Sequence, residues 1–274
     1  MNNIMEMFSY SFIVNSLIVG IIISVCSALL GLSLVLRNNS MIGDGLSHVS
    51  FGAFAVATVF HFAPLTFAIP IVILVSFLII KMDEHSEISN DTKIALISTS
   101  SLAIGTFLIS ALKGVNTDIN NYLFGSILSI SNKDVIISII LGIVVMILFI
   151  ISYNKIFAIT FDEKFAKSIG IATSFYDMLF AILCSITIVL GMRLLGSLLI
   201  SSLIIFPVIT TKGLFKTFKS VMFSSIVVSV ISFIIGFIIS YLYEVPTGST
   251  IVIVNIFFLL IVKLTLKVRK IYCK

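Results

Sequence analysis

The sequence predicts an all-α integral membrane protein, a polytopic helical bundle of eight or nine transmembrane helices in a single domain, residues 1–274. Of its residues 59% are hydrophobic and 11% are charged, and the mean hydropathy is +1.25. A soluble domain carries about a quarter charged residues, so no soluble fold of this length hides so much apolar surface. The spanning segments must be helices because an open sheet edge cannot be satisfied in lipid, and the short alternating strands of a barrel are absent.

Nine apolar runs supply the predicted helices, and a full span needs roughly 20 apolar residues. The runs cover residues 11–36, 49–62, 65–80, 94–112, 135–152, 175–192, 194–211, 221–243 and 248–266. The run 49–62 is short enough to be half of a broken helix, which leaves the count at eight or nine. The two runs on either side of Arg193 form either a tight hairpin or one long bent element. Pro70 and Pro207 lie inside runs, where neighbouring helices can satisfy the carbonyls that a kink frees.

The net charge of +5 indicates how the chain is oriented in the membrane and not a surface that binds nucleic acid, because the charges lie between the apolar runs and at the C-terminus. With nine spans and the N-terminus outside, fourteen of the 17 Lys and Arg residues fall on the inner side, and Lys113, Lys133 and Arg193 fall outside. The inner residues are Arg37, Lys81, Lys93, Lys155, Lys164, Lys167, Lys212, Lys216, Lys219, Lys263, Lys267, Arg269, Lys270 and Lys274. This bias predicts a multi-pass protein of the plasma (inner) membrane, surrounded by lipid, with a cytoplasmic C-terminus.

A polar segment between two apolar runs, NNSMIGDGLSHVSFG at residues 38–52, carries the main candidate site. If a helix begins near Asp44, then Asp44 and His48 lie one turn apart on the same face. A carboxylate and an imidazole at that distance can share a divalent cation, and the pair suits zinc, manganese or iron(II) without choosing between them. Gly43 and Gly45 would let the backbone break or approach a neighbour closely. The alternative is that Asp44 caps a helix and that His48 lies at the membrane interface.

The most charged internal loop, residues 153–177, contains a short amphipathic pattern in FDEKFAKSIG. As a helix it places Phe161, Phe165, Ala166 and Ile169 on one face, and Gly170 is a natural stop. Such a cytoplasmic helix either lies on the membrane surface or docks into a groove of a partner.

Two acids lie in the loops predicted to face outside. Asp118 belongs to an Asn- and Ser-rich loop, residues 114–134, and Glu244 precedes the last apolar run. They are candidates for an outer vestibule that receives a cation or a binding protein. The simpler interpretation, which we favour, is that both are solvated loop acids.

Five motifs in order along nearly the whole chain resemble the permease subunits of ABC importers for zinc, manganese or iron(II), the metal-chelate or type II importers. The first signature of that family, a basic residue followed by Gly-Asp-x-x-Ser-His, resembles residues 30–57. The other four motifs resemble NYLFGSIL (121–128), the coupling segment TFDEKFAKSIGI (160–171), LLGSLLISSLIIFPVIT (194–210) and VPTGSTIVIV (245–254).

The resemblance implies a type II ABC importer-like permease with a second permease protomer, a cytoplasmic ATP-binding cassette ATPase dimer and an extracytoplasmic metal-binding protein. The chain itself is then no enzyme, since ATP is hydrolysed on a separate partner, and it binds no permanent cofactor and no nucleic acid. Asp44 and His48 would line the path of the transported metal. The coupling segment 161–171, with Phe161, Asp162, Phe165, Ala166 and Gly170, would seat in the groove of the ATPase.

The expected mechanism is alternating access, in which the ion is held transiently and ATP-driven closure of the partners opens the inner side. His48 must be neutral to bind a metal, so transport should fall at acid pH. One rival is an ATPase-independent secondary transporter of divalent cations, which needs more ionisable groups inside its spans than this chain has. Another is an ABC permease for an iron chelate or other nutrient, which would not need a pair that binds bare metal.

Overall fold

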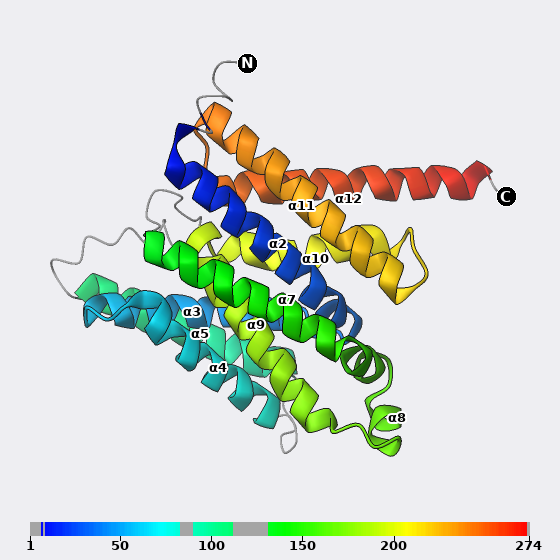
Figure 1. The fold of residues 1–274 in the computed structure, drawn as a ribbon, viewed down its shortest axis with the longest axis horizontal. Coiled ribbons are helices and arrows are strands. Elements are labelled where there is room, and N and C mark those ends of the chain that lie inside the picture. Colours follow the sequence, from blue (N-terminus) through cyan, green and yellow to red (C-terminus); the bar gives the residue numbers. More distant parts are fainter. Residues whose placement is uncertain (1–6, 8, 83–89, 112–130, 273–274) are drawn as a thin grey trace.

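The computed structural model describes residues 7, 9–82, 90–111 and 131–272, and within these ranges its regular elements are helices (Figure 1). The helices are α2 (Ser11–Leu36), α3 (Met41–Val59), α4 (Pro64–Met82), α5 (Asn90–Ala111), α7 (Asn132–Phe161), α8 (Glu163–Ser168), α9 (Thr173–Leu195), α10 (Ser197–Lys212), α11 (Phe218–Tyr243) and α12 (Thr247–Tyr272). The predicted all-α class is therefore confirmed for the described part of the chain.

Seven of the described helices are long and apolar enough to cross a membrane: α2, α3, α5, α7, α9, α11 and α12. Two shorter apolar stretches, Pro64–Ile79 in α4 and Ser197–Lys212 in α10, fall below that length, so the predicted count of eight or nine spans is not confirmed. The run 49–62 is not half of a broken helix, because α3 continues unbroken from Met41. A single residue, Gly196, separates α9 from α10 with a positive φ of 87°, a backbone conformation that glycine adopts without a steric penalty.

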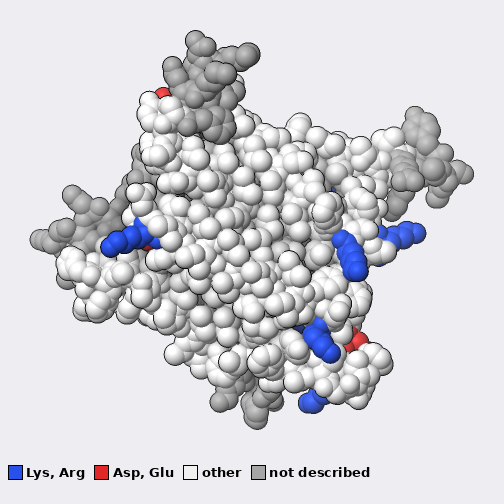
Figure 2. Space-filling view, in the orientation of Figure 1, with Lys and Arg blue, Asp and Glu red and all other residues white. Residues whose placement is uncertain are grey.

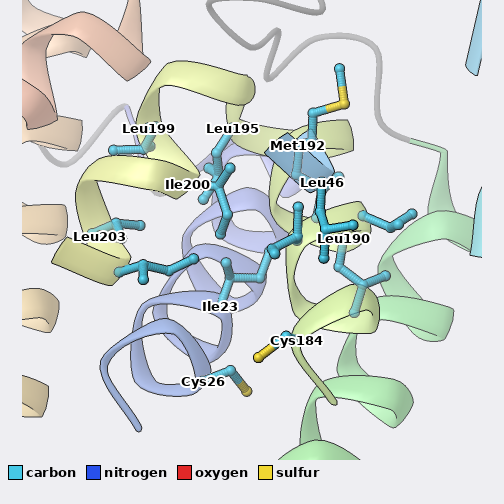
Figure 3. Close-up of a cluster of buried hydrophobic side chains, with 14 of the residues drawn as sticks. Ile23, Cys26, Leu46, Cys184, Leu190, Met192, Leu195, Leu199, Ile200 and Leu203 are labelled. Carbon is cyan, nitrogen blue, oxygen red and sulfur yellow. The ribbon is translucent and has the colours of Figure 1, made fainter. Parts of the chain in front are cut away.

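The core of the bundle lies among α2, α3, α9 and α10. Figure 3 shows its side chains converging from these four helices, including Ile23 of α2, Leu46 of α3, Leu190 of α9 and Leu203 of α10. By contrast, α5 and α12 bury only a small share of their apolar residues within this single chain. The bundle therefore has two layers. The inner helices are held in place by packing against one another, and the apolar faces of the outer helices are exposed to lipid or to another chain.

One end of the bundle gathers the segments predicted to be cytoplasmic. A cavity of about 290 Å³ at that end is lined by the α2–α3 turn, the end of α4, the start of α5, α8 and the start of α9. On the face seen in Figure 2, the middle of the surface is uncharged, and Lys and Arg side chains gather mainly toward α8 and the α10–α11 turn. This distribution agrees with the predicted charge bias.

Candidate functional site

α3 places the candidate metal pair inside its first two turns. The helix begins at Met41, and its N-cap position is Ser40, whose side chain makes no capping hydrogen bond. Asp44 therefore does not cap the helix, and the capping interpretation is wrong. As an acid in the first turn, Asp44 instead lies where the helix dipole favours negative charge.

Asp44 and His48 do share one face of α3. His48 Nε2 lies 3.6 Å from Asp44 Oδ2, and the two side chains are 24% and 46% exposed, respectively. The other ring nitrogen of His48, Nδ1, is buried and has no hydrogen-bond partner among the described residues. Two groups that can bind a metal thus converge at a position open on one side, although most of α3 is buried.

Ser201 of α10 is the member of the site that sequence reasoning missed. Its hydroxyl donates a hydrogen bond of 3.2 Å to Asp44 Oδ1, across 157 positions of sequence. The adjacent Ser202 faces away from this carboxylate and accepts a 3.4 Å bond from the Asn255 amide of α12. The available signal was the Ser-Ser pair inside the apolar run 194–211, because a polar group inside a span normally has a partner.

The glycines beside Asp44 are used for close packing and not for breaking the helix. Neither Gly43 nor Gly45 interrupts α3, so of the two predicted uses, a break or a close approach, the second applies. A Cβ atom at Gly45 would overlap the side chain of Ile94 on α5, and one at Gly43 would lie 3.2 Å from Ile204 Cδ1. The small residues therefore let α5 and α10 approach α3 on either side of the candidate pair.

The pair alone is an incomplete metal site. Within the described ranges no group of three or more His, Cys, Asp and Glu side chains is arranged to hold a metal ion. Bound zinc and manganese take four or more ligands, so two side chains leave coordination positions for further ligands. An arrangement of this kind can hold a cation weakly and release it.

The predicted coupling segment forms a short helix closed at both ends by its own residues. Asp162 is the N-cap of α8, and its carboxylate accepts a 2.9 Å bond from the Phe165 N–H. At the other end the Gly170 N–H donates to Lys167 O and the Ile171 N–H donates to Ala166 O, both at 3.1 Å. This is the Schellman pattern, and Gly170 takes the left-handed conformation that it requires, with a φ of 83°.

The prediction that four apolar side chains share one face of this helix is wrong. Phe161 ends α7, and Ala166 is the buried residue of α8, whereas Phe161, Phe165 and Ile169 are exposed. The reason is that six residues make under two turns, so the side that packs on α7 and α9 accommodates little more than Ala166. The three larger apolar side chains remain available for a partner or for lipid.

Of the two predicted outer acids, Glu244 lies within the described residues. Glu244 is exposed and ends α11 in a left-handed conformation, with its N–H bonded to Ser240 O. Asp118 lies outside the described residues. Also at this end, Arg193 Nη2 at the end of α9 lies 3.7 Å from Asp134 Oδ2 at the start of α7.

Comparisons with known proteins agree with this architecture over nearly the full length. The profile of the ABC 3 transport family matches residues 9–265. The manganese import system permease protein ScaB of Streptococcus gordonii is 31% identical over 246 residues, covering 90% of this chain and 88% of the relative. The high-affinity zinc uptake system membrane protein ZnuB of Haemophilus influenzae is 29% identical, covering 88% and 93%. The solved structure of PsaBC from Streptococcus pneumoniae in complex with Fab matches with a TM-score of 0.85 at 30% identity, covering 95% of this chain and 94% of that chain.

Proposed function

Because the chain belongs to the ABC 3 transport family, we propose that it is the membrane-spanning permease subunit of an ATP-driven importer of divalent metal ions. The observation that carries the proposal is the Asp44–His48 pair, held on one face of a helix that is long and apolar enough to span a membrane. Ionisable groups at such positions are costly and are normally retained for function. The cargo is zinc or manganese, the ions named for two relatives, with iron(II) sharing the same ligand preferences.

Asp44 and His48 act as a transit site and not as a storage site. Two protein ligands with a partly open side suit an ion that must bind and then leave. A second copy of this chain, related by a twofold axis, would bring the same pair to the cation and raise the protein ligands to four. The apolar faces of α5 and α12 are available for such a protomer and for lipid.

ATP hydrolysis takes place on a separate cytoplasmic ATPase dimer, which docks on α8. The support is the cluster of exposed apolar side chains on and beside a helix that is fixed by its own caps. Exposed aromatic side chains at a rigid position are typical anchors of protein interfaces. The coupling segment 161–171 then passes the ATPase motion into α7 and α9, the two helices that it joins. The whole described chain serves as one permease domain.

The orientation that fits this arrangement has the C-terminus in the cytoplasm of a cell with this chain in its plasma (inner) membrane. The end that carries α8 also carries most of the Lys and Arg side chains visible in Figure 2. The opposite end would then receive an extracytoplasmic metal-binding protein. No nucleic acid and no permanent cofactor take part in this mechanism.

The test measures uptake of radioactive zinc and manganese into proteoliposomes that hold the permease, its ATPase and its binding protein. Asp44→Asn and His48→Gln keep the side-chain size and should each lower uptake by at least about tenfold, the lower bound for disturbing the surroundings of a metal ligand. Matched controls are Asp91→Asn, an exposed acid in the first turn of α5, and His61→Asn, an exposed histidine beyond α3, where Asn tolerates the positive φ.

Three outcomes contradict the proposal. Full uptake of zinc and manganese by both pair variants would show that residues 44–48 are not in the metal path, whereas a wild-type complex that imports neither ion would favour a permease for a chelate or another nutrient. Uptake by the chain without any ATPase would favour a secondary transporter. Transport of one ion and not the other by the wild-type complex would name the cargo.

A further inference from the structure

An ion pair joins the start of α9 to the turn between α2 and α3. Arg37 is the first residue after α2, and Asp177 lies on the first two turns of α9. Arg37 Nη1 donates a 2.7 Å bond to Asp177 Oδ1, and the two side chains are 18% and 19% exposed. The guanidinium carbon of Arg37 also lies 5.6 Å from the ring centre of Phe180, one turn further along α9. Arg37 is thus held on α9 at two points.

The pair lies in the wall of the 290 Å³ cavity between the coupling helix and the helix of the metal pair. Glu163 and Lys167 of α8 line this cavity on one side, and Asn39 of the α2–α3 turn and Ile42 of α3 line it on another. Arg37 and Asp177 lie in its wall, where α9 also packs directly against α2 and α3, so the ion pair adds a polar bond to this packing. From Asp177 the chain leads back four residues to the start of α9, and from Arg37 it leads seven residues forward to Asp44.

Stability alone is a poor reason to keep this pair. A buried ion pair contributes little compared with well-packed apolar residues of the same volume, because both charges must leave water. Arg37 is also incompletely satisfied, since its Nε is buried without a hydrogen-bond partner among the described residues. What the pair does supply is a strong directional bond between the start of α9 and the α2–α3 turn, in the wall of the cavity.

We propose that Arg37 and Asp177 form a tie that transmits movement of the coupling helix to α3, so that ATP hydrolysis and release of the metal from Asp44 and His48 occur together. This inference rests on the proposed function. Both are positioning residues, since neither belongs to the metal pair or to the coupling segment 161–171. The cavity gives α8 and the start of α9 room to move, and the tie ensures that the α2–α3 turn moves with them. Without the tie, the ATPase turns over and α3 follows poorly.

The experiment measures zinc and manganese imported per ATP hydrolysed, using the complete complex in proteoliposomes. Arg37→Gln and Asp177→Asn should each lower this ratio on the order of tenfold, within the usual range of coupling between two sites. ATP turnover and metal affinity of the complex should stay near the wild-type values. The double variant should import no less metal per ATP than either single variant, because the two residues act through one bond. The double variant also leaves no unpaired buried charge, so it can be measured even if a single variant fails to fold.

The matched control is the ion pair at the other end of α9. Asp134 and Arg193 are buried to a similar extent, at 16% and 17% exposure, and join α7 to α9 far from α8. Asp134→Asn should lower uptake and ATP hydrolysis only in proportion to the amount of folded complex, with the ratio unchanged. An unchanged ratio in the Arg37 and Asp177 variants would overturn the tie, as would an equal fall in the control. A wild-type complex that imports no metal would overturn the proposed function itself.

Discussion

Of the 19 residues of α3, twelve are buried among neighbouring helices, whereas α8 has six residues and buries Ala166. α3 is held in place by close packing: Gly45 packs against Ile94 of α5, and Gly43 packs near Ile204 of α10. α8 is held by hydrogen bonds at its ends, from the Asp162 cap to the Schellman pattern at Gly170. We therefore expect larger side chains in α3, the helix of the metal pair, to disrupt the fold. We expect substitutions on the exposed side of α8, the proposed ATPase contact, to leave the fold intact.

The largest effect should come from adding volume to α3. Gly45→Leu is expected to lower the stability of the folded protein by about 1–3 kcal/mol and to remove most folded material, because its side chain overlaps Ile94. The measurement is thermal unfolding of the detergent-purified protein, followed by size-exclusion chromatography.

A rescue variant decides whether the overlap is the cause. Gly45→Ala should destabilise less than Gly45→Leu, and combining it with Ile94→Ala should restore the unfolding temperature because the second change removes the obstructing side chain. No recovery in the double variant would mean that Gly45 is needed for a reason other than its contact with α5.

A substitution on the exposed side of α8 should leave the fold intact and weaken binding of the ATPase subunit. Phe165 is 59% exposed, so the Phe165→Asp variant should have the same unfolding temperature as the wild type. Its affinity for the ATPase subunit should fall roughly 30-fold, the effect of losing an interface contact worth about 2 kcal/mol. Titration of labelled ATPase onto the purified permease checks this. Tyr243→Asp, an exposed aromatic at the opposite end of the bundle, is the control and should bind normally; equal affinities for the two variants would remove α8 from the interface.

The smallest effect should come from the hydroxyl beside the metal pair. Ser201→Ala removes the bond to Asp44 Oδ1 and is expected to weaken metal binding about fivefold, as for a hydrogen bond worth about 1 kcal/mol. Isothermal titration of zinc and manganese measures it. Ser202→Ala is the matched control because its hydroxyl bonds to Asn255 instead. A larger loss at Ser202 than at Ser201 would show that the link from α10 to α12, and not the orientation of Asp44, matters for the cargo.

The sequence by itself determined the class of the protein and the features that depend on short spacing. Composition requires a membrane bundle of helices, and a four-residue separation places Asp44 and His48 on one face wherever a helix forms. The helix stop at Gly170 was predictable for the same reason, since the end of a helix is decided by neighbours a few residues away. The sequence left open whether Gly43 and Gly45 break the helix or permit close packing, because only the neighbouring helices decide which use applies.

Tertiary structure alone decided the contacts that join distant segments. Ser201 meets Asp44 across 157 positions, and Arg37 meets Asp177 across 140. No local pattern contains such pairings, because they depend on which helices lie side by side and on how each is rotated. It also decided that Ala166 faces inward while Phe165 and Ile169 face outward, since α8 is too short for a periodic pattern to fix its face. Local chemistry thus specifies the helices and their ends, and packing specifies which of their polar groups can act together.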